Sequence, residues 1–174
     1  MSNVIYRKAT INDAYGIEYV GANSWKESYW DYMPHDYLET RVATVENKIE
    51  RARNLLETTN TYYVAEIDNK VIGILHYKES QNEKYKDYGY LESIYVLEKY
   101  QGQGIGKELF RLAINGLNDL GYNKMYLECL QGNKTINFYK KYGGKIVEIV
   151  DFPIKDFVVK ADIVLFEDIN AIFK

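Results

Sequence analysis

The sequence predicts a single domain of the mixed α/β class, a mixed β-sheet with helices packed on it. The chain has 174 residues, which is the length of one domain and short for two. Its 47% apolar and 27% charged residues are an ordinary globular balance. Segments with helical apolar spacing alternate with short runs rich in β-branched and aromatic residues. We therefore expect residues 1–174 to form one α/β (α+β) domain.

The first third of the chain is predicted to be one strand followed by two helices. Residues 4–8 have the composition of a short strand. A helix is expected to begin at Thr10, a good N-cap with an acidic residue three positions later, and to run toward Trp25. Pro34 interrupts this helix, and residues 36–56 are predicted to form a single second helix.

The remainder is predicted to continue as strand, strand, strand, helix, strand, helix, strand, strand. The first two of these strands are joined by a tight turn at Asp68 and Asn69, and the last helix ends at Gly143-Gly144. The expected strands are 61–67, 71–77, 88–97, 124–130, 145–150 and 158–166. The expected helices run from the glycine-rich segment 101–106 to about 120 and over 133–142.

Charge and composition argue against several classes of protein. The net charge is −3, and the sequence has no basic stripe of the kind that nucleic-acid-binding proteins carry. The single cysteine, Cys129, excludes an intramolecular disulfide, and the two histidines, His35 and His76, have no cluster of partners that would make a metal site. Residues 1–8 do not resemble a signal peptide, and no run of about 18 apolar residues occurs. We expect a cytoplasmic protein without a membrane partner.

The glycine-rich segment 101–106 is the most informative part of the sequence. It lies between a predicted strand and a predicted helix, where backbone N–H groups form an anion site and Lys107 adds a positive charge. The P-loop motif fails, because Gln101 takes its first glycine position and Glu108 replaces its Ser or Thr. The dinucleotide motif fails because Lys107 replaces its third glycine. A glycine turn without a ligand is the alternative.

Two motifs resemble those of the GNAT acetyltransferases. The pattern Gln101-x-x-Gly104-x-Gly106 is similar to the family signature [RQ]-x-x-G-x-[GA], and the residues at 94–96 resemble the strand before it. The segment 133–144 is similar to the family's Asn, Phe-Tyr, Gly pattern. Aromatic residues in the N-terminal third also fit, so the resemblance covers nearly the whole chain. At Gly144 the family commonly has phenylalanine, a departure that removes one core aromatic residue.

The resemblance implies that acetyl-CoA binds where two parallel strands, 88–97 and 124–130, splay apart. The pyrophosphate would lie on the amides of 101–107, the pantetheine arm would pair with the backbone of Ile94 and Val96, and the Ile94 amide would polarise the acetyl carbonyl. The implied cofactor contacts are Ile94, Tyr95, Val96, Gln101, Gly102, Gln103, Gly104, Ile105, Gly106, Lys107, Asn133 and Tyr139.

Three residues are candidates for proton transfer. Tyr139 matches the family's tyrosine that protonates the departing sulfur, and its ordinary pKa of about 10 lies near that of a thiol, at about 8.5. The alternative for Tyr139 is packing behind Phe138. Glu92 and Glu128 are candidate bases, and Glu92 is ranked first because it lies two residues before Ile94 on one strand. Either glutamate could instead be an exposed charge.

The expected reaction is direct transfer of acetyl to the primary amine of a small molecule, such as a polyamine, an amino acid or an aminoglycoside. The aromatic wall of the acceptor pocket would be formed by Trp25, Tyr29, Trp30 and Tyr32. The alternative is that these side chains pack in the core, above all Trp25. Cys129 is expected to be a core residue and not a nucleophile. The alternative functions are a protein or peptide acetyltransferase and a non-catalytic acyl-CoA-binding module. Exposed strand edges and the 18 tyrosines would allow a homodimer.

Overall fold

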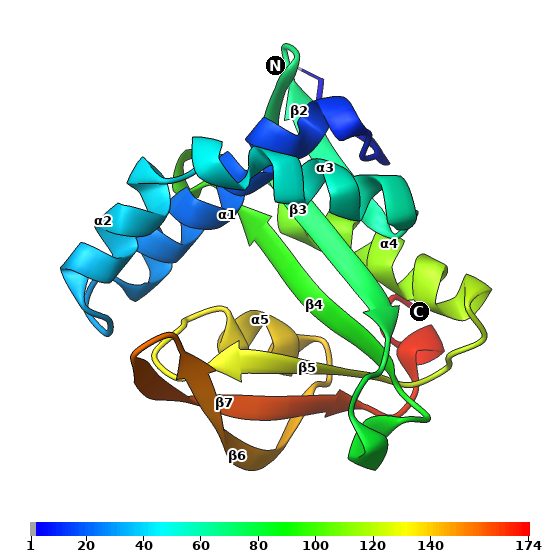
Figure 1. Cartoon of the computed structure of the whole chain (residues 1–174). Helices are drawn as coiled ribbons and strands as arrows, with labels where there is room; N and C mark the ends of the chain where they lie inside the picture. Colours follow the sequence, from blue (N-terminus) through cyan, green and yellow to red (C-terminus); the bar gives the residue numbers. More distant parts are fainter. Residues whose placement is uncertain (1–2) are drawn as a thin grey trace. The chain divides into compact units, whose positions relative to one another are not determined.

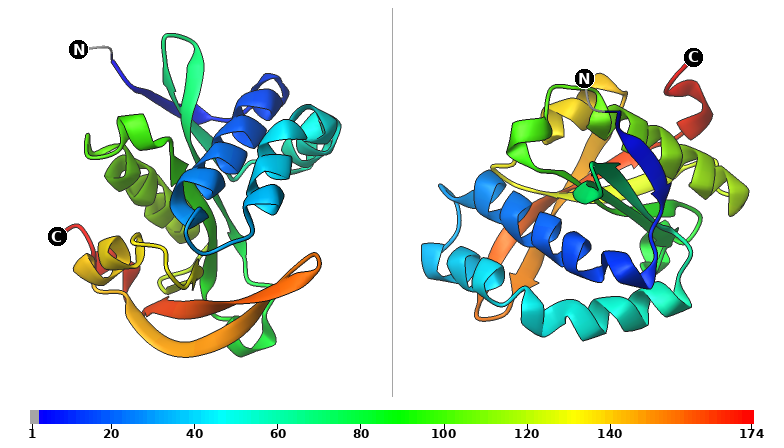
Figure 2. Two further views of the ribbon diagram at one scale, coloured as in Figure 1. Left: turned by 90° about the vertical axis from the view of Figure 1, so that its left-hand side faces the viewer. Right: turned by 90° about the horizontal axis from the view of Figure 1, so that it is seen from above.

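The structure is a computed structural model that describes residues 3–174 (Figures 1 and 2). Its contacts divide the chain into two compact units. The first unit runs to His76 and includes Ser93–Ala113, and the second comprises Tyr77–Glu92 and Ile114–Lys174. Two strands and one helix contribute residues to both units.

Seven strands form one mixed sheet in the order β1-β2-β3-β4-β5-β7-β6. The strands are β1 (Ile5–Lys8), β2 (Tyr62–Ile67), β3 (Lys70–Glu79), β4 (Gly89–Val96), β5 (Met125–Leu130), β6 (Lys145–Ile154) and β7 (Phe157–Phe166). The α-helices are α1 (Ala14–Tyr29), α2 (His35–Ala43), α3 (Ile49–Thr58), α4 (Ile105–Asp119) and α5 (Ile136–Lys141). This architecture confirms the predicted α/β class.

The single helix predicted over residues 36–56 is wrong, because two helices occupy this range. Helix α2 ends at Ala43 and α3 begins at Ile49, with a 3₁₀ turn at Glu46–Lys48 between them. Thr44 is the point of the break. It is the C-cap of α2, and both its backbone N–H, at 3.0 Å, and its hydroxyl, at 2.7 Å, donate to the Thr40 carbonyl. The apolar spacing continues across the break, and for this reason it predicted one helix.

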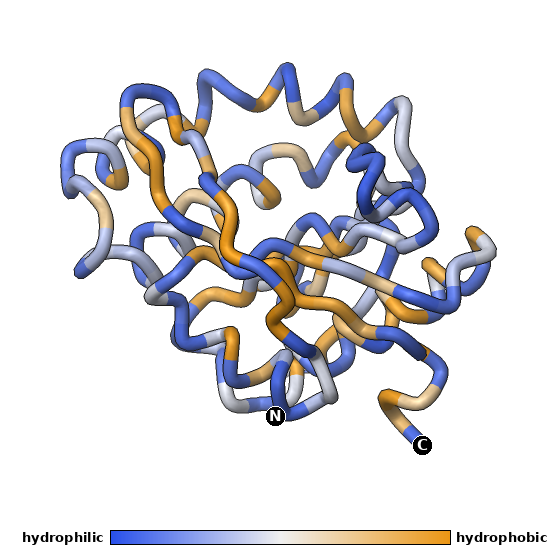
Figure 3. The backbone as a smooth tube through the Cα atoms, turned by 90° about the horizontal axis from the view of Figure 1, so that it is seen from below, coloured by the Kyte–Doolittle hydropathy of each residue, from blue (hydrophilic) through white to orange (hydrophobic). Residues whose placement is uncertain are grey.

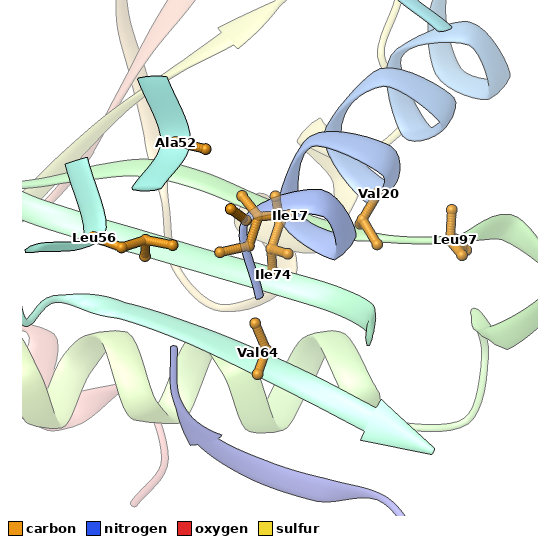
Figure 4. Close-up of a cluster of buried hydrophobic side chains, with 8 residues drawn as sticks. Ile17, Val20, Ala52, Leu56, Val64, Ile74 and Leu97 are labelled. Carbon is orange, nitrogen blue, oxygen red and sulfur yellow. The ribbon is translucent and has the colours of Figure 1, made fainter. Parts of the chain in front are cut away.

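The core of the first unit lies where α1 and α3 cover one face of the β2–β3 hairpin. Ile17 and Val20 of α1 and Leu56 of α3 meet Val64 and Ile74 of the two strands (Figure 4). The hairpin turns at Asp68 and Asn69, both in the left-handed region with φ of 49° and 61°, as the predicted tight turn requires. On the other face, a Cβ at Gly73 would lie 3.3 Å from Leu109 of α4. Helices therefore pack on both faces of this hairpin.

Arg7 links β1 to its neighbours. Its guanidinium donates to both carboxylate oxygens of Asp13, at 2.7 and 2.8 Å, and to Glu66 of β2. Asp13 also accepts the Thr10 amide at 2.7 Å, as expected at the predicted helix start. Burial alone would raise the pKa of Asp13, but the hydrogen bonds from Arg7 and Thr10 lower it. The carboxylate therefore stays ionised and joins the first strand to the first helix.

The second unit is built on β5, β6 and β7. Strand β7 pairs antiparallel with both others, and β5 pairs parallel with β4 through Gly89↔Met125 and Tyr90↔Tyr126. A Cβ at Gly144 would lie 2.7 Å from Val164 and 2.8 Å from Phe166. Phe166 thus fills the space into which a side chain at 144 would project, which accounts for the departure from the family pattern.

Hydropathy along the chain agrees with these layers. Helical segments in Figure 3 alternate between hydrophobic and hydrophilic pieces, as expected for helices that bury one face. Within the described residues, 3–174, no helix combines the length and the apolar character that crossing a membrane requires.

Two glycines of α1 give a matched stability test of the first unit. A Cβ at Gly21 would lie 3.9 Å from Ile74, an ordinary contact, so Gly21→Ala is expected to raise the free energy of unfolding by about 0.4–1 kcal/mol. A Cβ at Gly16 would lie 2.7 Å from Val71, so Gly16→Ala is expected to lower it by about 1–3 kcal/mol. Urea unfolding of both variants measures the difference, and equal effects would contradict the packing of α1 on β3.

Candidate functional site

The segment before α4 is an open turn that needs glycine. Gly102 and Gly104 have φ of 74° and 85°, in the left-handed region that other residues rarely adopt. A Cβ built at Gly102, Gly104 or Gly106 would meet nothing within 4 Å. Packing therefore does not demand these three glycines, and the space beside them is open to a ligand.

This turn includes the amides at the start of α4 that have no acceptor within the helix. The Gln101 amide donates to the Glu98 carbonyl at 3.0 Å, and the first amide bonded within the helix is that of Glu108, which donates to Gly104 at 3.1 Å. An α-helix leaves its preceding amides without intrahelical acceptors. The donors available to an anion therefore begin after Gln101, and the helix dipole adds a partial positive charge to them.

Two side chains brace this turn, and sequence reasoning gave neither of them that role. Gln101 donates its side-chain amide to the Val96 carbonyl at 2.8 Å and so ties the turn to the end of β4. The carboxylate of Glu27, on α1, accepts the Glu98 amide at 3.0 Å. The family motif marks Gln101 but does not say what its side chain contacts, and no motif marks Glu27.

Tyr139 lies in the second unit, on α5, and is 6% exposed. Its ring packs edge-on against Phe138 with centroids 5.4 Å apart, and its carbonyl accepts the Gly144 amide at 2.9 Å. Asn133 accepts the Thr135 amide at 2.9 Å, so its side chain caps the turn before α5. Tyr139 is thus held firmly, and Asn133 has a local structural task.

Glu92 and Glu128 form an interacting carboxylate pair in the second unit. They follow the paired residues Tyr90 and Tyr126 by two positions on parallel strands and so leave the same face of the sheet. Burial, and secondly the charge of Glu92, raise the pKa of Glu128. Glu92 itself forms an ion pair with Lys78. The two acids thus have different environments: Glu92 has a cationic partner, and the pKa of Glu128 is raised.

The predicted acceptor residues form two groups in the first unit. Trp25 donates its indole N–H to the Tyr95 hydroxyl at 2.9 Å and meets Tyr29 edge-on with ring centroids 5.1 Å apart. Trp30 instead stacks on His35 at 3.8 Å, and Tyr32 is exposed. The structure therefore brings Trp25 and Tyr29 together with Tyr95 and gives Trp30 a separate partner.

Other reactive side chains have features that bear on chemistry. Cys129 is buried, and burial raises the pKa of its thiol to about 12, so it is a poor nucleophile at neutral pH. His76 is buried and stacks on Tyr62 with ring centroids 4.2 Å apart. Over the part of the chain that is described, no three His, Cys, Asp or Glu side chains gather as metal ligands would.

Comparison with known proteins identifies the family. Residues 22–144 match the acetyltransferase (GNAT) family, which is more than half of the chain. The chain belongs to this family. It is therefore an acyltransferase, and the matched range includes the glycine turn and Tyr139.

Relatives and solved structures agree with this assignment. The chain is 26% identical over 170 residues to the uncharacterized N-acetyltransferase YuaI of Bacillus subtilis, covering 97% of this chain and 96% of that protein. It is 32% identical over 109 residues to an N-alpha-acetyltransferase of Sulfurisphaera tokodaii, covering 56% of this chain and 64% of the relative.

The fold is similar to that of the PaiA N-acetyltransferase of Thermoplasma acidophilum in complex with coenzyme A. The TM-score is 0.74 and the identity 21%, and the match covers 94% of this chain and 98% of the other. YncA of Salmonella typhimurium, solved with acetyl-CoA, matches with a TM-score of 0.69 and 17% identity over 97% and 95% of the two chains.

Two glutamates of the second unit predict pH effects of opposite sign. Because the folded-state pKa of Glu128 is raised, mainly by burial, the folded state loses stability as pH rises from the unfolded pKa of about 4.3 to the folded value. Glu128→Gln is therefore expected to raise the melting temperature at pH 7, with little effect at pH 3.

Glu148→Gln is the control. Hydrogen bonds from Lys84 and Tyr85 lower the pKa of Glu148, so its stabilisation is present at neutral pH and disappears as pH falls through the folded value. This variant should lower the melting temperature at pH 7. Two changes of the same sign at pH 7 would contradict the described environments.

Proposed function

We propose that this chain transfers the acetyl group of acetyl-CoA directly to the primary amine of a small molecule. The observation that carries the proposal is the open turn of Gly102, Gly104 and Gly106 at the start of α4. Family membership gives the reaction class, and the turn gives this chain a place for the phosphates of the donor.

Two features of the turn support a pyrophosphate at this position. A Cβ built at any of the three glycines would have no protein atom within 4 Å. Because glycine lacks this Cβ, an anion can approach the backbone there. Gln101 and Glu27 hold the turn through Val96 and Glu98. The site is therefore preorganised, which lowers the ordering cost of binding.

Acetyl-CoA, when bound, supplies the thioester carbonyl that the amine attacks. The backbone amide of Ile94 would donate to the carbonyl oxygen as negative charge develops on it. Tyr139 would give its hydroxyl proton to the departing sulfur, since a phenol of ordinary pKa about 10 is an adequate acid for a thiolate.

The carboxylate pair supplies the proton acceptor. An amine must lose a proton to become a nucleophile, and a base works best when its pKa lies near the working pH. Burial and the charge of Glu92 raise the pKa of Glu128 in this direction. Glu92 keeps a cationic partner, Lys78, and can attract the ammonium form of the acceptor. We therefore favour Glu128 as base and Glu92 as the residue that attracts the amine.

A peptide N-terminus is the second candidate acceptor, because one relative at 32% identity is an N-alpha-acetyltransferase.

The experiment that distinguishes these acceptors measures the release of free thiol from acetyl-CoA in the presence of polyamines, amino acids, aminoglycosides or short peptides. Release that depends on a small amine supports the proposal, release only with peptides supports the second candidate, and binding without release would make the chain an acyl-CoA-binding module.

A size series at Gly106 tests the phosphate position. Gly106 lies in α4 without left-handed backbone, so Gly106→Ala and Gly106→Leu are expected to keep the fold. Acetyl-CoA affinity should fall with side-chain size, by at least about tenfold for leucine through loss of backbone hydrogen bonds to the phosphates. Calorimetry measures the affinity and thermal melting checks the fold. Equal affinity across the series would contradict this position.

Tyr139→Phe tests the acid, with Tyr142→Phe as the matched control at the end of the same helix. Removal of the Tyr139 hydroxyl should lower kcat by about 10²-fold, the lower end of the usual contribution of a general acid, with little change in acetyl-CoA affinity. The Tyr142 ring meets Phe138 edge-on and Phe173 at a tilt, contacts that phenylalanine can keep. Full turnover in Tyr139→Phe would remove Tyr139 from the mechanism.

A further inference from the structure

Three cations act electrostatically on one acid among the helices of the first unit. Glu18 of α1 interacts with Arg41 of α2, Lys48 of the following 3₁₀ turn and Arg51 of α3. Burial lowers the pKa of Lys48, and Arg41 and Arg51 lower it further against the opposing effect of Glu18. This cluster, Glu18–Arg41–Lys48–Arg51, therefore carries an excess of positive charge, part of it shielded from water.

Arg41 is the member with an unused hydrogen-bond donor. Its guanidinium lies 4.3 Å from the centroid of the Trp25 ring, and its Nη1 donates to the Tyr37 hydroxyl at 3.3 Å. Its Nε atom is buried and has no hydrogen-bond partner in the part of the chain described. A buried donor without an acceptor is costly. An anion that accepted from this guanidinium would remove that cost and offset the excess charge.

The surrounding rings disfavour a cation. Arg41 already covers Trp25, and Lys26 lies 5.2 Å from the centroid of Trp30. The two aromatic side chains expected to receive a cationic acceptor therefore already carry cations of the protein itself. A second cation would be repelled at short range, whereas an anion would be attracted.

We infer that Arg41, supported by the charges of Lys48 and Arg51, binds a carboxylate, and that the acceptor is an amine that also carries one, such as an amino acid. A planar guanidinium matches a carboxylate through two parallel hydrogen bonds. The contacts lead from Arg41 through Trp25 to the Tyr95 hydroxyl, beside Ile94 on β4. The identity of the acceptor rests on the proposed function, whereas carboxylate binding at Arg41 does not.

Because the Nε atom is buried, the inferred carboxylate binding requires the Arg41 guanidinium to move over the Trp25 ring from its present 4.3 Å. A cation–π contact persists to about 6 Å from the ring centroid, so such a movement is compatible with the indole contact.

Tryptophan fluorescence tests the carboxylate site without any need for activity. Trp25 and Trp30 are the two tryptophans of the chain, so Trp30→Phe leaves Trp25 as the reporter. Titration with acetate at constant ionic strength should change its emission saturably, and Arg41→Met should abolish the change. Arg41→Lys, which keeps the charge but loses the planar fork, should weaken it. Arg53→Met removes an exposed arginine of α3 and should leave the titration unchanged. No response to acetate, or a response to sulfate alone, would overturn the carboxylate assignment.

Paired acceptors test the substrate class. Lysine and 1,5-diaminopentane differ by one carboxylate. Arg41→Met should raise KM for lysine by about ten- to a hundredfold, the range for a lost hydrogen bond to a charged group, with kcat and the diamine little affected. Equal effects on the two acceptors, or none on lysine, would overturn the role of Arg41 in acceptor choice. If no amine were acetylated, the proposed function would fail, and the fluorescence titration would still decide the carboxylate site.

Discussion

The left-handed backbone at Gly102 and Gly104 is the constraint on which the candidate site depends. It carries the chain from the 3₁₀ turn at Glu98–Tyr100 into α4, and the space beside its glycines is open. Glycine adopts this backbone at less cost than residues with a Cβ atom. Gln101 and Glu27 hold the turn by bonds to the backbone at Val96 and Glu98. The anion binding that we propose here would thus depend on the backbone, which these side chains position.

The second unit shows how burial assigns different tasks to similar groups. Glu92 has a lysine partner, whereas Glu128 is half-buried beside it and its pKa is raised. Two carboxylates in different environments are a common basis for acid–base chemistry. The same physical effect makes Cys129 inert, because burial raises the pKa of its thiol to about 12. These features favour direct transfer over a cysteine-bound intermediate.

Local patterns in the sequence predicted the α/β class, the hairpin at Asp68 and Asn69, and the glycine turn, because each depends on residues close together in the chain. The break at Thr44 was missed, since apolar spacing continues across it. Arg41 was missed because Trp25, which lies on another helix, meets it only in the folded chain. Glycine at 144 became explicable once Phe166, far along the sequence, was seen to fill the space beside it. The roles of Tyr139, Glu92, Glu128 and Asn133 stay predictions.

The central claim is that the turn before α4 binds the phosphates of acetyl-CoA, and nuclear magnetic resonance of ¹⁵N-glycine-labelled protein tests it most directly. Of the 12 glycines, Gly102, Gly104 and Gly106 should show the largest amide shifts on titration with coenzyme A. Pantetheine, which lacks the pyrophosphate, should leave these three nearly unchanged. Coenzyme A binding that shifts other glycines and leaves these three in place would contradict the account.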